Sequence, residues 1–134
     1  MEKRGKESYL SLALRVVGFI FIFGLLPLTQ FWPSGWAWHD HGRSEYLEMI
    51  MGLYATLGVF LIIAAKHPRQ HLSLIWFTVW SSIVHAAIMA VQSLVDLKHI
   101  GHLWGDVAAL LIVAGLLAYL SPRSVDVLPP PEPT

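Results

Sequence analysis

Four long apolar runs, separated by short polar segments, dominate the pattern of hydrophobic and polar positions along the chain. Each run is about 20 residues long, the length at which a helix crosses the roughly 30 Å hydrocarbon core of a bilayer. The runs do not alternate polar and apolar positions as spanning β-strands do, so helices are expected. The predicted helices cover approximately residues 9–28, 46–65, 72–95 and 103–120.

These runs predict an all-α fold, a four-transmembrane-helix bundle that forms one domain at residues 9–121. A polar segment, 1–8, precedes the bundle. The proline-rich segment 122–134 follows it and is expected to be a disordered tail. We interpret the first run as a retained helix and not a signal peptide, because its apolar core is longer than the roughly 15 residues typical of signals.

Lysine and arginine are unevenly distributed between the two sides of such a bundle. The side of the termini carries seven, namely Lys3, Arg4, Lys6, Arg15, Lys66, Arg69 and Arg123. The opposite side carries only Arg43 and Lys98. Because positively charged loops stay in the cytoplasm, both termini are predicted to be cytoplasmic.

The composition fits a membrane protein and excludes several kinds of chemistry. Hydrophobic residues make up 55% of the chain and charged residues 13%, against roughly 25% charged residues in soluble domains. The formal net charge is zero, so no overall field favours a nucleic-acid partner. The chain has no cysteine, which excludes disulfides, thiolate metal sites and thiol redox chemistry.

Polar residues in the last three predicted helices recur at spacings of three, four or seven, which keep them on one helix face. A charge that faces lipid costs about 2.5–3.5 kcal/mol, so these faces are expected to turn inward. We therefore expect an outward-facing polar pocket formed by Glu48, His85, Gln92, His102 and Asp106. His85 should lie roughly 10 Å deeper than the two carboxylates, near the middle of the bilayer.

Two interpretations of this predicted pocket stay open, and no catalytic residue is assigned. A set of Glu48, His85 and Asp106 suits acid–base chemistry or ligand binding. The alternative is structural, because a buried histidine often bridges helices through a hydrogen bond. Acidic residues near helix N-termini also stabilise the helix dipole without any further role.

The histidines raise the question of a cofactor. Imidazole and carboxylate ligands suit zinc or copper, and the candidate ligands on the outer side are His39, His41, His99 and His102. Their spacing matches no strong metal signature. His85, beside two small alanines, is a candidate axial ligand for a single haem or chlorin. The cofactor is therefore unknown, and the chain is also compatible with having none.

Three tryptophans lie between the first two apolar runs, and another lies at the start of the last run. Indole rings prefer the interface between lipid and water. The predicted interface anchors are Trp32, Trp36, Trp38 and Trp104.

The stretches "SLIWFTVWSSIVHAAIMAVQ" and "GHLWGDVAALL" are distinctive parts of the sequence. Together with the rest of approximately residues 8–122, they resemble a family of small bacterial four-helix membrane proteins of unknown function. The resemblance implies a multi-pass protein of the bacterial inner membrane and carries no activity with it.

We therefore predict a small integral inner-membrane protein, a non-enzymatic accessory or structural subunit of a larger membrane complex. The alternative is a ligand-binding protein or acid–base enzyme that uses the polar pocket on a lipid-like or small apolar molecule. The expected partners are membrane lipids and either a larger complex or further copies of the chain, with no nucleic acid.

Overall fold

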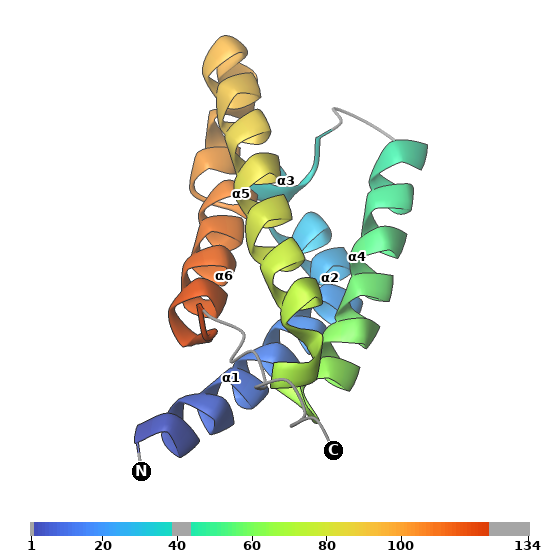
Figure 1. Cartoon of the computed structure of the whole chain (residues 1–134). Helices are drawn as coiled ribbons and strands as arrows, with labels where there is room; N and C mark the ends of the chain where they lie inside the picture. Colours follow the sequence, from blue (N-terminus) through green and yellow to red (C-terminus); the bar gives the residue numbers. More distant parts are fainter. Residues whose placement is uncertain (1, 39–43, 124–134) are drawn as a thin grey trace, which may run out of the picture.

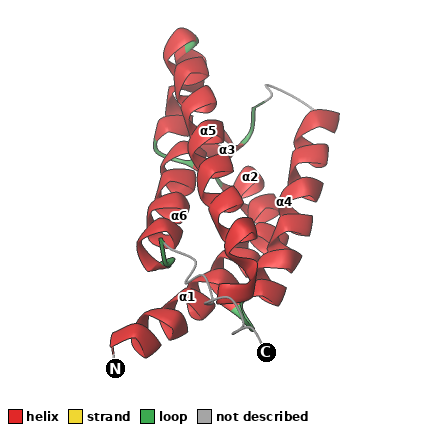
Figure 2. Ribbon diagram, viewed as in Figure 1, coloured by secondary structure: helices red, strands yellow, loops and turns green. Residues whose placement is uncertain are grey.

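The computed structural model of the chain describes residues 2–38 and 44–123 and is helical almost throughout (Figure 1). The elements are α1 (Glu2–Phe19), the π-helical turn η1 (Ile20–Gly24), α2 (Leu25–Phe31), α3 (Pro33–Trp36), α4 (Glu45–Ala64), the 3-10 helix η2 (Pro68–His71), α5 (Leu72–Val95), the 3-10 helix η3 (Leu97–Leu103) and α6 (Asp106–Leu120). No strand occurs in this described part of the chain (Figure 2).

Four continuous helical stretches are long and apolar enough to cross a membrane. They are Arg4–Phe31, Glu45–Ala64, Pro68–Val95 and Leu97–Leu120. This confirms the predicted all-α fold with four spanning helices, and the chain is a small multi-pass membrane protein. Which side of the membrane holds the termini stays a prediction.

The helix bounds differ from the predicted ones at the first and the last span. The first helix already begins at Glu2 and continues through η1 and α2 to Phe31. The last span is interrupted, because η3 ends at Leu103 and α6 begins only at Asp106. The interruption lies at Gly105, where the backbone of Gly35 in α3 approaches so closely that a Cβ atom would collide with it.

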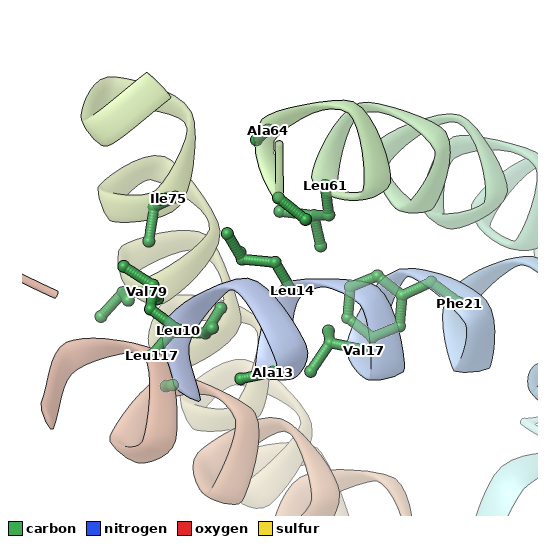
Figure 3. Packing of buried hydrophobic residues seen from close by; sticks show 12 residues of the cluster. Leu10, Ala13, Leu14, Val17, Phe21, Leu61, Ala64, Ile75, Val79 and Leu117 are labelled. Carbon is green, nitrogen blue, oxygen red and sulfur yellow. The ribbon is translucent and has the colours of Figure 1, made fainter. Parts of the chain in front are cut away.

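The main apolar core lies where α1 crosses the other long helices (Figure 3). α1 contributes Leu10, Ala13, Leu14 and Val17, which are the inward positions of an amphipathic helix. They pack against Leu61 of α4, Ile75 and Val79 of α5, and Leu117 of α6. One face of α1 therefore ties the three remaining spans together.

Two glycines let α1 and α4 approach each other closely. A Cβ atom on Gly58 would lie 2.5 Å from the carbonyl oxygen of Gly18, and a Cβ atom on Gly18 would lie 2.6 Å from that of Gly58. Small residues at a helix crossing allow this kind of contact in membranes.

α4 is the least buried of the four spans. Only 17% of the 18-residue apolar stretch of α4 is buried, against 33% of the corresponding stretch in each of the other spans. It packs along α1 and η1 and touches α5 little. In Figures 1 and 2 the two helices are nearest at η2 and separate towards Glu45. Most of the surface of α4 is consequently left for lipid or for another protein.

Candidate functional site

The carboxylate of Asp106 is the centre of a buried polar network at the start of α6. Its Oδ2 atom accepts a hydrogen bond from Trp38 Nε1 at 2.8 Å. His102 Nδ1 lies 2.9 Å from the same oxygen and donates to it when the carboxylate is ionised. Asp106 is 6% exposed and His102 is 1% exposed. The network therefore joins the segment after α3 to η3 and α6.

Stacked rings complete this network. The Trp38 ring stacks on His102, with centroids 4.0 Å apart, and on His99, with centroids 5.0 Å apart. His99 in turn lies 3.4 Å from the Asp96 carboxylate, measured from Nδ1 to Oδ2. One indole thus covers both histidines of η3 while its N–H points at Asp106.

The close approach of α3 to η3 positions Trp38 for these contacts. A Cβ atom on Gly101 would lie 2.5 Å from the carbonyl oxygen of Ser34, and one on Gly105 would collide with that of Gly35. Only glycine fits at both positions without displacing α3. Gly101 and Gly105 are four residues apart, and this spacing seats the short helix α3 against η3 and the residues that follow it.

A second polar pair lies at the middle of the spans. The hydroxyl of Tyr54, half-way along α4, and Nδ1 of His85 in α5 are 2.7 Å apart. With Nδ1 as acceptor, the remaining ring proton of His85 is on Nε2. The Tyr54 ring also meets Phe21 edge-on, with centroids 4.9 Å apart. This hydrogen bond is a polar link between α4 and α5, two helices that otherwise touch little.

The two polar groups are neighbours. Asp106 lies close enough to Tyr54 and His85 for its charge to act on both side chains. Trp38 and Tyr54 also pack against the same small apolar cluster, which consists of Ala86, Met89, Val107 and Leu110. The seam between α5 and α6 therefore brings Asp106 and the Tyr54–His85 pair into one region.

Of the five residues predicted to form a pocket, three lie together in this region and two lie apart from it. His102 and Asp106 are in direct contact, and His85 lies within reach of the Asp106 charge. Glu48 and Gln92 have exposed side chains near the ends of α4 and α5 that lie away from η2. The inner part of the site is thus formed by residues from α5, η3 and α6, together with Trp38 and Tyr54.

The second oxygen of the Asp106 carboxylate, Oδ1, has different surroundings from Oδ2. Asp106 Oδ1 is buried and has no hydrogen-bond partner among the described residues. The carboxylate lies at the N-terminus of α6, where the N–H of Val107 adds an electrostatic attraction. A buried acceptor without a donor suits a bound water or a ligand group that donates a hydrogen bond.

The predicted metal ligands divide into two pairs. His39 and His41 lie outside the described residues. The rings of His99 and His102 have centroids 5.8 Å apart, and both stack on Trp38. Within the described ranges, no group of three or more histidine, aspartate or glutamate side chains is arranged to hold a metal ion.

The predicted tryptophan anchors have different surroundings. Trp104 is 78% exposed and Trp32 is 44% exposed, as rings at an interface would be. The Nε1 atom of Trp36 is buried. Trp38 departs most from the expectation of a simple anchor, because its N–H donates to Asp106 and its ring stacks on His99 and His102.

Tyr54 is the residue that sequence reasoning missed. A signal for it exists: tyrosine favours the membrane interface, yet Tyr54 lies at the centre of an apolar span. A hydroxyl at that depth needs a partner, because lipid offers none. Tyr54 and His85 both lie near the middle of their helices, but only the packing of α4 against α5 shows that they are partners.

We expect Tyr54→Phe to lower the free energy of unfolding by about 1 kcal/mol, the size of an interhelical hydrogen bond in membranes. The phenyl ring keeps the packing against Phe21 and removes only the hydroxyl. Tyr46→Phe is the matched control, because Tyr46 lies in the same helix and is 80% exposed. Unfolding in mixed micelles measures both, and equal stabilities of the two variants would contradict the assigned hydrogen bond.

Comparison with known proteins leaves this site without an assigned role. No curated protein and no solved structure matches the chain. The family of unknown function DUF6632 matches residues 6–132, in agreement with the predicted resemblance to such a family. Because this match includes all four spans and nearly the whole sequence, the chain belongs to the family of unknown function DUF6632.

Proposed function

We propose that this chain is a non-enzymatic accessory subunit of a larger complex in the bacterial cytoplasmic membrane, with both termini in the cytoplasm. The observation that carries the proposal is that the buried polar side chains hydrogen-bond one another. Asp106 binds Trp38 and His102, and His85 binds Tyr54. Each contact joins different segments of the fold, as structural hydrogen bonds in a bundle do.

The exposed surface of α4 supports the proposal that another membrane protein binds the chain. α4 packs on one side only, along α1 and η1. Its outer face carries Leu53, Val59 and Phe60, and a Cβ atom on Gly52 would meet nothing within 4 Å. Without a hydrophobic driving force in lipid, helices associate through close packing at small residues. Gly52 beside bulky side chains offers another helix such a surface.

Photo-crosslinking from two matched positions tests this proposal. Leu53 on α4 and Ile112 on α6 are 65% and 68% exposed. A photoreactive residue at Leu53 should form one discrete adduct with another membrane protein in cells, and the same residue at Ile112 should label lipid only. Equal labelling from both positions, or an adduct of twice the chain mass at Leu53, would contradict an accessory role. The second result would indicate a homo-oligomer instead.

A second candidate function is binding or acid–base conversion of a small apolar or lipid-like molecule. It is favoured by one observation: Asp106 Oδ1 is buried without a hydrogen-bond partner among the described residues, in the same region as the Tyr54–His85 pair. His85, hydrogen-bonded to the Tyr54 hydroxyl, provides an imidazole and a phenol that can transfer a proton. Asp106 would orient a donor group of the ligand.

Extraction of the purified protein tests the second candidate. Small molecules that remain with the wild-type protein after detergent exchange are identified by mass spectrometry. His85→Gln should lose such a molecule, whereas Tyr46→Phe should retain it, with the same helical content in both. Identical extracts from wild type and His85→Gln would remove this candidate.

A further inference from the structure

Contacts between distant segments bring four parts of the chain to one end of the bundle. The Ser11 hydroxyl donates to the carbonyl oxygen of Ala65 at 2.6 Å, which joins α1 to the end of α4. Arg69 of η2 binds Glu7 of α1, with Nε and Oε2 3.2 Å apart. Figure 1 shows the start of α1, η2 and the end of α6 at this same end.

This end is strongly basic. Its exposed cationic side chains are Arg4, Lys6, Lys66, Arg69 and Arg123, and we call this set the basic end. Among side chains that the structure describes, Glu7 is the one acidic group here, and it is bound to Arg69. The other described carboxylates, those of Glu45, Glu48, Asp96 and Asp106, belong to the opposite halves of their helices or to η3.

The geometry of α1 puts the basic end at headgroup depth. The first span has 28 residues, or about 42 Å of helix, which exceeds the roughly 30 Å hydrocarbon core. α1 accordingly runs obliquely across α5 and α6 (Figures 1 and 3). Its first turns carry Arg4 and Lys6 before the buried Leu10 and Leu14 begin the apolar part. Because charged side chains are costly in the hydrocarbon core, these charged first turns belong in the polar layer of the membrane.

Aromatic rings mark the same layer. Tyr9 and Tyr119 are 64% and 71% exposed, and exposed tyrosine is typical of the membrane interface. The ammonium group of Lys6 lies 5.2 Å from the centroid of the Tyr119 ring, within the range of a cation–π contact. The ammonium group of Lys6 is thus held beside a ring of the kind that favours the layer between headgroups and acyl chains.

We propose that the basic end is a binding surface for the phosphate headgroups of anionic phospholipids. A headgroup phosphate is attracted by the basic side chains of α1, η2 and the segment after α6. The acyl chains of the same lipid lie along the exposed Leu12 and Val16 of α1. Several basic residues directly beside spanning helices are typical of sites for anionic lipids. This inference is independent of the accessory-subunit proposal and concerns a different surface from α4.

Lipid titration of the intact protein tests this inference. The full chain is reconstituted in nanodiscs of phosphatidylcholine with increasing phosphatidylglycerol, and bound lipid is measured by native mass spectrometry after release. We expect preferential retention of phosphatidylglycerol, weakened by salt because exposed charges are screened. Lys66→Gln and Arg123→Gln should each lower the apparent affinity about fivefold, since each basic residue contributes on the order of 1 kcal/mol.

Lys98→Gln is the matched control, because Lys98 is exposed in η3, away from the basic end. It should leave phosphatidylglycerol retention unchanged, and Lys66→Arg should preserve it even if Lys66→Gln fails to fold. Equal retention of the two lipids, or an equal loss in Lys98→Gln and Lys66→Gln, would overturn the inference. Competition by inorganic phosphate at equal concentration would overturn the assignment to a lipid.

Discussion

Replacing Asp106 by alanine is expected to lower the free energy of unfolding by about 2–6 kcal/mol, because two buried donors lose their acceptor at a cost of about 1–3 kcal/mol each. The carboxylate accepts from Trp38 and contacts His102, and both Asp106 and His102 are almost completely buried. Without it, the indole N–H and the imidazole Nδ1 lose their acceptor in a region closed to water. Unfolding in mixed micelles measures the loss.

Two further variants separate the contacts of Asp106. Asp106→Asn keeps an oxygen that accepts from Trp38, so its loss should be smaller than that of alanine. Trp38→Phe removes the N–H donor and keeps a ring that can stack on His102. A double-mutant cycle between Asp106→Asn and Trp38→Phe then measures their coupling. Wild-type stability of Asp106→Ala would show that the network does not hold the bundle together.

The same variants bear on function. If the protein is an accessory subunit, Asp106→Asn should lower the free energy of unfolding, and any loss of function should be proportional to that decrease. In a ligand-binding protein, Asp106→Asn abolishes retention of the ligand while most of the stability remains, because Oδ1 has no hydrogen-bond partner among the described residues and can accept one from a ligand. The ratio of the two losses therefore distinguishes the two candidate functions.

Replacing Gly58 by alanine is expected to destabilise the bundle by about 1–3 kcal/mol, the usual cost of overpacking a core. The new Cβ atom would lie 2.5 Å from the backbone oxygen of Gly18 and 2.9 Å from the Ile22 side chain. A backbone oxygen has no rotamer with which to give way, so α1 and α4 must move apart. Gly58→Val, with a larger side chain, should cost more.

Gly52→Ala is the internal control for Gly58→Ala. Both glycines belong to α4, but a Cβ atom on Gly52 meets nothing within 4 Å. Alanine there should be neutral or should stabilise the helix by about 0.5–1 kcal/mol, because glycine is the poorer helix former. Equal effects at the two positions, measured in the same micelles, would refute the close crossing of α1 and α4.

Local patterns predicted part of the site as well as the helices. His102 and Asp106 are four residues apart, a spacing at which neighbouring turns of a helix bring side chains together, and the structure joins them even though η3 and α6 form a broken helix. Trp38 could not be predicted in this way. It lies 68 residues from Asp106 in the sequence, and no periodicity within one segment relates two such positions.

The sequence by itself determined that this protein crosses a membrane with four helices, because the length and hydropathy of each run are properties of contiguous residues. Tertiary structure alone decided which polar groups meet: Trp38 with Asp106, and Tyr54 with His85. Those pairings depend on how far each helix is rotated and shifted against its neighbours. Contacts such as Gly18 with Gly58 and Gly105 with Gly35 set these positions, and they exist only when separate segments pack together.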